Sequence, residues 1–242
     1  MKSAGTAITH QVVNDKTARA SKDGRRYLAM AYEPPDSIKA EAGELFIYIS
    51  YDPTLAALAK KIVTASGKAY YSPRADAEGR FQLSIRAVNE LLNPTDLPIS
   101  VSIAAIKDGK ALVVNTTGVE ALVVGGDKSS LLSNHEAKSL RDPKAILLNP
   151  SDNLFLLDSS NYSRIKKHFT KLSGLTQPGF TKLMLKFAQS NSDGYFSILR
   201  IQAISEPKES TTNPKSELPG RKKSFGQTIA RLSKSLFVRT KH

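Results

Sequence analysis

Four aspartates lie beside segments of the chain that we expect to form buried strands: Asp23, Asp52, Asp158 and Asp193. Carboxylates that converge can hold divalent cations, because these hard ions prefer oxygen ligands that carry formal negative charge. Bound cations lower the pKa of a water molecule and assist hydrolysis. A single acid is more often a solvated turn residue, and Asp52 before Pro53 is typical of a helix N-cap. The chemistry therefore depends on whether the elements bring the four side chains together.

Other common catalytic arrangements are missing from the sequence. The chain has no Cys, which excludes disulfides and thiolate zinc sites. Its four histidines, His10, His135, His168 and His242, are scattered and show no metal-ligand spacing. There is no Gly-x-Ser-x-Gly segment, so a hydrolase nucleophile elbow is not expected.

The elements that must position these residues follow from hydrophobic periodicity. Runs rich in Val, Ile, Leu and Tyr predict strands at 27–32, 45–50, 99–106, 111–115, 120–124, 145–148, 154–157 and 195–203. Apolar residues at helical spacing predict helices at 54–65, 81–92, 162–172 and 180–189. Asp108-Gly109 between two strands predicts a hairpin. Strand pairs that alternate with helix pairs indicate an α+β domain.

The motifs at the strand ends resemble, in order, those of the protein phosphatase 2C family, the metal-dependent Ser/Thr phosphatases. The resemblance covers residues 8–204. In that family one strand ends in Asp-Gly and a later one in Ser-Asp-Gly, and both aspartates hold metal. Ser50-Tyr51 stands at the first place and Asp158-Ser159-Ser160 at the second. The resemblance implies that Ser50 and Ser159 replace metal-binding acids. Asp158, one place earlier, is expected to point to the opposite face of its strand.

The remaining motifs of the family are also degenerate here. Asp23 keeps the final acid of the opening Arg-x-x-Asn-x-Asp, and Asn115 keeps the first residue of Asn-x-Gly-Asp-Ser-Arg. Asn134 stands in an Asp place, and Asp193 or Gly194 matches the last metal-binding Asp. The resemblance implies a four-layer α-β-β-α sandwich, in which two antiparallel sheets are flanked by helix pairs. It leaves Asp23 and Asp193 as vestigial metal candidates, with no expected metal site and no catalytic residue.

The charge of the chain predicts a separate binding segment at its C-terminal end. The net charge is +13, and residues 221–242 contribute seven bases and no acid. Residues 205–220, rich in Pro, Ser, Thr, Lys and Glu, are expected to link this tail to a domain at 1–204. A basic amphipathic helix is predicted in the tail. Its expected partner-binding residues are Arg221, Lys222, Lys223, Phe225, Ile229, Arg231, Leu232, Lys234 and Leu236.

We expect a catalytically inactive phosphatase-like domain that acts as a regulatory or protein-binding module without a cofactor. One alternative is an active metal-dependent Ser/Thr phosphatase that uses Mn or Mg, with a rearranged site built from the four aspartates. A second alternative is a basic nucleic-acid-binding protein, which 7% aromatic residues and no Trp disfavour. The expected partner is a protein, such as a kinase or signalling component. An anionic membrane is an alternative partner for the tail, and nucleic acid is not expected. The absence of Cys, of a signal core and of a membrane span predicts a cytoplasmic protein.

Overall fold

The structure is a computed structural model of the whole chain. It describes residues 6–14, 26–32, 36–72, 76–92, 97–126, 128–132, 138–190 and 197–205. The chain divides into two units, Met1–Pro207 and Lys208–His242, and every described residue belongs to the first. The predicted tail and residues 206–220 of the predicted linker lie outside the described residues, so the division into domain, linker and tail stays a prediction.

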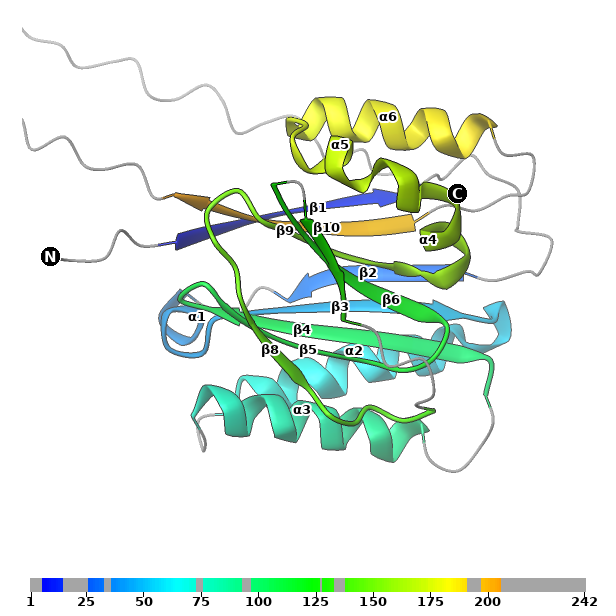
Figure 1. Cartoon of the computed structure of the whole chain (residues 1–242). Helices are drawn as coiled ribbons and strands as arrows, with labels where there is room; N and C mark the ends of the chain where they lie inside the picture. The colour runs from blue at the N-terminus through cyan, green and yellow to red at the C-terminus, as the bar shows by residue number, and fades with distance from the viewer. Residues whose placement is uncertain are drawn as a thin grey trace, which may run out of the picture. The chain divides into compact units, whose positions relative to one another are not determined.

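Two five-stranded sheets form the middle of the first unit (Figure 1). The first has the order β1-β10-β9-β6-β7, with strands Thr6–Asn14, Ser197–Ser205, Asn153–Asp158, Val119–Gly125 and Lys128–Leu131. The second has the order β2-β3-β4-β5-β8, with strands Arg26–Tyr32, Glu44–Tyr51, Ile99–Lys107, Lys110–Asn115 and Lys144–Leu147. Neighbouring strands in both sheets are antiparallel.

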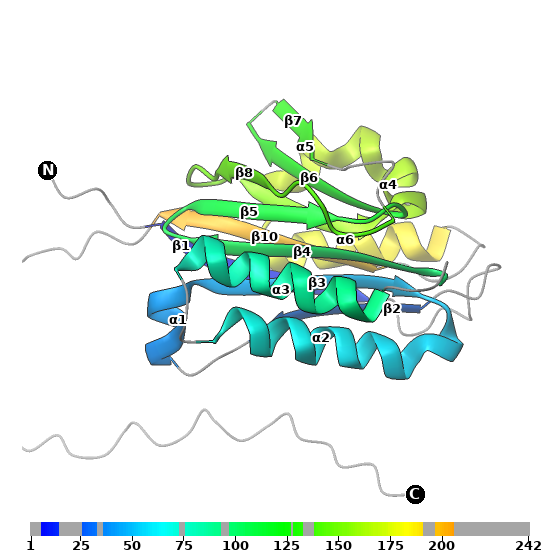
Figure 2. The same ribbon diagram turned by 90° about the horizontal axis from the view of Figure 1, so that it is seen from below.

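Helices cover the outer faces of both sheets. On the second sheet lie α2 (Ala56–Tyr70) and α3 (Ala77–Leu92), which run side by side in Figure 2. On the first sheet lie α4 (Ser159–Ile165), the 3-10 turn η2 (Lys166–His168), α5 (Phe169–Ser173) and α6 (Gln177–Ser190). Short elements α1 (Asp36–Ala42) and η1 (Pro53–Leu55) flank β3 in the sequence. The predicted four-layer α-β-β-α sandwich is thus confirmed.

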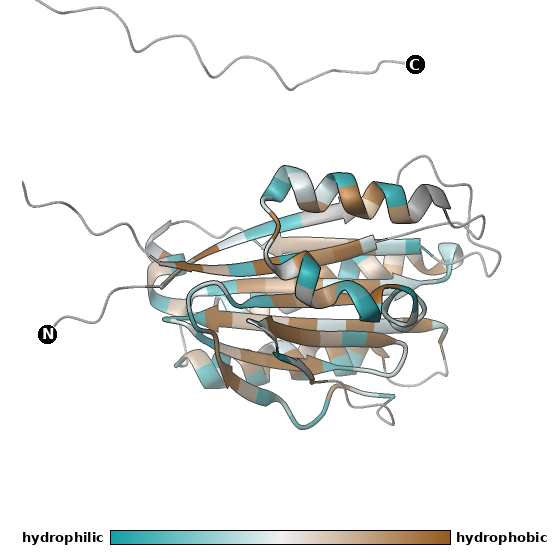
Figure 3. Ribbon diagram, turned by 45° about the horizontal axis from the view of Figure 1, so that its top comes forward, coloured by the Kyte–Doolittle hydropathy of each residue, from teal (hydrophilic) through white to brown (hydrophobic). Residues whose placement is uncertain are grey.

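Alternation along each strand divides the apolar side chains among three cores. Figure 3 shows long hydrophobic stretches, drawn in brown, along the strands of the sheets. On β3, Phe46 and Tyr48 face the other sheet, whereas Ile47 and Ile49 face α2 and α3. On β9, Leu154 and Leu156 face the other sheet, whereas Phe155 and Leu157 face α4–α6. The central strands β3, β4 and β9 are therefore buried on both faces, so they are almost continuously apolar in sequence.

The β4–β5 hairpin is confirmed, and its turn shows why Asp-Gly was informative. Asp108 and Gly109 both have positive φ, at 49° and 75°. Two consecutive left-handed residues suit a tight two-residue turn, and Gly adopts that conformation without steric cost.

The structure also contains elements that the sequence did not predict. β1 pairs with β10 as an edge strand, and β7 and α1 are short. The single predicted helix at 162–172 is instead divided into α4, η2 and α5. Short or half-polar segments carry little periodic signal, because a few residues cannot distinguish a strand from a turn. Among the helices of the described residues, none combines the length and apolar character needed to cross a membrane.

Candidate functional site

The ends of β3 and β9 meet across the space between the two sheets. There Ser50 Oγ donates a hydrogen bond to Asp158 Oδ2 at 2.8 Å. Both side chains are buried, with 0% of Ser50 and 4% of Asp158 exposed. Ser50 faces inward because it follows Phe46 and Tyr48 at the strand period of two. A buried polar pair thus stands where the family resemblance placed metal-binding acids.

The expectation that Asp158 points away from this space was wrong. Asp158 is the last residue of β9 and shares a face with Leu154 and Leu156, which lie between the sheets. Ser159 is already the first residue of α4. Its hydroxyl donates at 2.7 Å to Glu120 Oε1, so it does not face Ser50. The inward place that the family resemblance assigned to Ser159 belongs to Asp158, one residue earlier.

Asp158 also caps the helix that follows it in the sequence. Its Oδ1 accepts a hydrogen bond from the backbone N–H of Ser160 at 2.9 Å, and Asp158 is the N-cap of α4. Aspartate at an N-cap satisfies an amide that has no partner within the helix. Both carboxylate oxygens of Asp158 are therefore engaged, one across the sheets and one at the start of α4.

Three further residues surround the pair and were not identified from the sequence. The Tyr48 hydroxyl donates to the Ser197 carbonyl at 3.1 Å, which is a second hydrogen bond between the sheets. Burial, and next the charge of Asp158, raise the pKa of Tyr48 well above its ordinary value. The Asn161 amide donates weakly to the same carbonyl at 3.4 Å. The sequence could have predicted this place for Tyr48, because Tyr48 lies two residues before Ser50 on the same strand and therefore faces the same side.

Asn115 and Glu120 flank the turn by which the chain passes from β5 in the second sheet to β6 in the first. The Asn115 side chain donates to the Val119 carbonyl at 3.0 Å and so closes the turn. Glu120 is 5% exposed and lies opposite Leu157, on the helix side of the first sheet. Asp158 and Glu120 are thus two buried carboxylates on adjacent strands whose side chains leave the sheet on opposite faces.

The other predicted candidates do not join this cluster among the residues that the structure describes. Asp52 caps η1 and accepts from the Thr54 N–H at 2.9 Å, as its place before Pro53 predicted. The vestigial candidates Asp23 and Asp193 lie outside the described residues, as do Asn134 and all the partner-binding residues of the tail. Those assignments stay predictions.

The described part of this site does not fit a pair of divalent cations. In residues 6–14, 26–32, 36–72, 76–92, 97–126, 128–132, 138–190 and 197–205, no three His, Asp or Glu side chains are grouped closely enough to hold one. Ser50 offers a neutral hydroxyl, and Asp158 already accepts two hydrogen bonds. Tyr51 also stands where the resemblance expects a glycine, which would let the backbone approach a metal.

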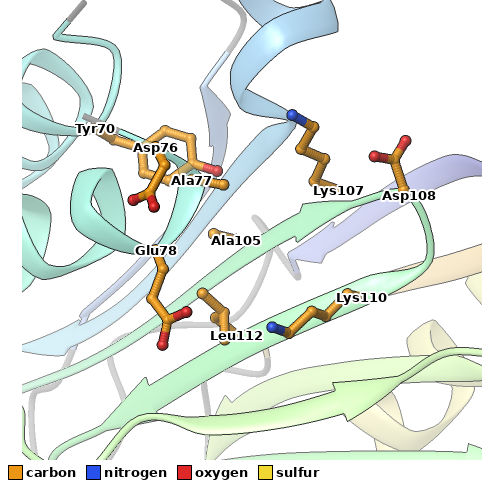
Figure 4. A pocket seen from close by; sticks show the side chains of 9 residues that line it. All are labelled: Tyr70, Asp76, Ala77, Glu78, Ala105, Lys107, Asp108, Lys110 and Leu112. Carbon is orange, nitrogen blue, oxygen red and sulfur yellow. The ribbon is translucent and has the colours of Figure 1, made fainter. Parts of the chain in front are cut away.

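A pocket of about 420 Å³ lies elsewhere, at the opposite end of the second sheet (Figure 4). It opens between the start of α3 and the β4–β5 hairpin. One of its acids is Asp76, whose side chain accepts a hydrogen bond from the backbone N–H of Gly79 at the start of α3. Lys107 donates to the Glu41 carbonyl. The lining residues are Tyr70, Asp76, Ala77, Glu78, Ala105, Lys107, Asp108, Lys110 and Leu112. The mixture of charges indicates no particular ligand.

Comparison with known proteins identifies the fold. No family model and no curated protein matches the sequence. Among solved structures, the PP2C phosphatase domain with a regulatory fragment of the cell fate determinant SpoIIE from Bacillus subtilis matches at TM-score 0.59 and 11% identity. The match covers 84% of this chain and 65% of that one, less than two thirds.

Two further bacterial proteins match over nearly their whole length. PppA of Pseudomonas aeruginosa, described as a key regulatory component of T6SS, has a TM-score of 0.59 and 9% identity over 82% of this chain and 100% of that one. The serine/threonine phosphatase PstP/Ppp of Mycobacterium tuberculosis has a TM-score of 0.54 and 12% identity over 82% and 99%. The described domain therefore has the fold of the PP2C-type Ser/Thr phosphatases.

Proposed function

We propose that this chain is a catalytically inactive phosphatase-like domain that acts as a cytoplasmic regulatory or protein-binding module. The observation that carries the proposal is the buried hydrogen bond between Ser50 and Asp158, 2.8 Å long, at the ends of β3 and β9. Only Asp158 of this pair is a carboxylate, whereas PP2C-type chemistry would need acids on both strands to hold two cations.

Charge is the reason why this replacement matters. A pair of divalent cations is held by several carboxylates, which compensate its positive charge. Ser50 supplies no charge, and Asp158 is committed to the Ser50 hydroxyl and the start of α4. These contacts stabilise the junction between the sheets without a metal. The same residues would therefore serve the fold rather than a reaction.

A regulatory role agrees with how the fold is used elsewhere. PppA is described as a regulatory component, and SpoIIE as a determinant of cell fate. We extend such a role to this chain as a protein-binding module, whose partner is a kinase or another signalling component. The basic tail at 221–242 is proposed as a second contact with that partner or with an anionic membrane surface.

The proposal is tested by metal titration of the full chain. Ligand that binds only the folded state stabilises it by about 2.7 kcal/mol at a concentration of 100 times Kd. We expect no change in Tm with manganese or magnesium, and no manganese-dependent hydrolysis of p-nitrophenyl phosphate. A matched control is a catalytically active PP2C-type phosphatase measured in the same buffers, which must respond to manganese.

One observation favours an active enzyme as the second candidate. Asp158 faces the space between the sheets, so a site that recruits Asp23 and Asp193 would start with one well-placed carboxylate. In that case manganese would raise Tm, and hydrolysis would be lost in Asp158→Asn. Both results together would replace the proposal by the enzyme.

A further inference from the structure

The helical layer on the first sheet carries positive charge alone. Between Ser159 and Ser190 the sequence contains no Asp and no Glu. Six bases lie there, and all six are exposed: Arg164, Lys166, Lys167, Lys171, Lys182 and Lys186. In the part of the chain that the structure describes, ion pairs join Lys39 to Glu44 and Arg80 to Glu41, so none of the six is paired there.

The bases are arranged along the outward faces of the helices. On α6, Phe180 and Met184 are buried, while Lys182 and Lys186 lie one turn apart on the opposite side. On η2 and α5, Lys167 and Lys171 have the same spacing of four. These two exposed pairs form two basic stripes, one on α6 and one across η2 and α5.

Half-buried aromatic side chains lie within the same layer. His168 of η2 and Phe187 of α6 place their rings 4.9 Å apart, so the two stripes belong to helices in contact. Tyr162 of α4 stacks on Phe169 and is also half-buried. The layer therefore offers partly apolar side chains among its bases.

The opposite helical layer differs, although it belongs to the same sandwich. α2 and α3 carry five bases, but they also carry Glu78 and Glu90. Their Arg80 is 2% exposed and paired with Glu41. Positive charge without nearby acids is thus specific to the α4–α6 layer, and it does not follow simply from the basic composition of the whole chain.

We infer that the α4–α6 layer docks an acidic, amphipathic protein helix, an inference that rests on the proposed role as a protein-binding module. Six exposed bases without an acid complement a row of Asp or Glu, and such complementarity directs association. The rings of Tyr162 and Phe187 are half-buried, and apolar side chains of a partner helix would cover the parts that remain accessible.

An anionic membrane fits the layer less well. Stable binding in a membrane interface needs apolar side chains that enter the lipid. Among the described residues the large exposed hydrophobic side chains are Met30 of β2 and Leu147 of β8, and neither lies on α4–α6. The charge without an exposed apolar anchor therefore favours a protein partner.

The test compares two charge-reversal variants of the full chain. The first carries Lys167→Glu, Lys171→Glu, Lys182→Glu and Lys186→Glu. The matched control carries the same change of charge on the other layer: Lys60→Glu, Lys61→Glu, Lys68→Glu and Arg86→Glu. All eight positions are exposed, and the tail is present in every protein, so its contribution is constant.

The probe is a fluorescein-labelled helical peptide of Glu, Leu and Ala with an acidic and an apolar face. The second probe is its scrambled form, which has equal charge and no apolar face. We expect the α4–α6 variant to bind the amphipathic peptide about 30-fold more weakly than the natural chain. The control should change less than about threefold, and added salt should weaken binding. The scrambled peptide should bind more weakly than the amphipathic one.

Several outcomes would overturn the inference. These are equal losses in the two variants, equal binding of both peptides, or no binding of the peptide at all. If a DNA duplex or phosphatidylserine vesicles instead bind more tightly than the amphipathic peptide and lose that binding in the α4–α6 variant, the result would assign the layer to that partner. Manganese-dependent hydrolysis by the same preparations would refute the proposed inactivity, but lysine-dependent peptide binding would still stand.

Discussion

Ser50→Asp is the substitution that most directly tests the contact between the sheets. It places a second carboxylate beside Asp158, where the natural oxygen-to-oxygen distance is 2.8 Å and both side chains are buried. Two negative charges about 4 Å apart repel by about 4 kcal/mol at an effective dielectric constant of about 20. The introduced carboxyl can avoid this repulsion by keeping its proton.

Keeping the proton has a cost of similar size at neutral pH. An unperturbed Asp has a pKa of about 3.9, so protonation at pH 7 costs about 4 kcal/mol. Both routes predict that Ser50→Asp lowers the free energy of unfolding by about 4 kcal/mol at pH 7. The pKa of the introduced carboxyl is raised in the folded state. The penalty therefore grows as pH rises above about 3.9 and should be only about 1.5 kcal/mol at pH 5.

Urea unfolding followed by circular dichroism measures these differences, since the chain has no Trp. Ser50→Asn is the matched control, because its amide can donate to Asp158 without adding charge. Ser50→Ala should cost about 1–3 kcal/mol, because it leaves a buried acceptor without its donor. If Ser50→Asp is as stable as the natural chain at pH 7 without metal, the two side chains do not meet in a buried contact.

Two further predictions concern buried groups away from this pair. Arg200→Met should lower the free energy of unfolding by about 1–3 kcal/mol, because Arg200 Nε donates to Asn153 Oδ1 at 2.7 Å and the substitution removes this buried donor. Arg200→Lys is the control, and an unchanged urea midpoint in Arg200→Met would contradict the assignment. Burial raises the pKa of Tyr70 to about 12, so the stability that its proton provides is complete below about pH 10 and is lost as pH rises from about 10 to about 12. Tyr70→Phe removes the hydrogen bond to the Ala42 carbonyl, which costs about 1 kcal/mol of unfolding free energy at pH 8. The urea midpoints of the natural chain and of Tyr70→Phe should therefore converge near about pH 11. Midpoints that keep a constant difference between about pH 8 and pH 11 would refute this.

The sequence alone predicted the fold class and most elements, because these depend on local periodicity. The spacing of Leu58 and Ile62 indicated α2, and Asp108-Gly109 indicated the hairpin that joins β4 and β5. The order of strand pairs and helix pairs then favoured an α+β domain, and the resemblance to the PP2C family implied two sheets with helices outside. The N-cap role of Asp52 was also visible, since a cap depends on the next few residues.

The candidate site was decided by tertiary structure. Ser50 and Asp158 are 108 residues apart, and their contact depends on how two sheets pack. The sequence placed Ser159 at the inward position because a motif was aligned one residue away from the true register. A slip of one residue reverses every side chain in a strand, and only the pairing of β9 with β6 and β10 determines which face is buried. Local patterns therefore fixed which elements form, whereas the register between distant strands decided which residues meet.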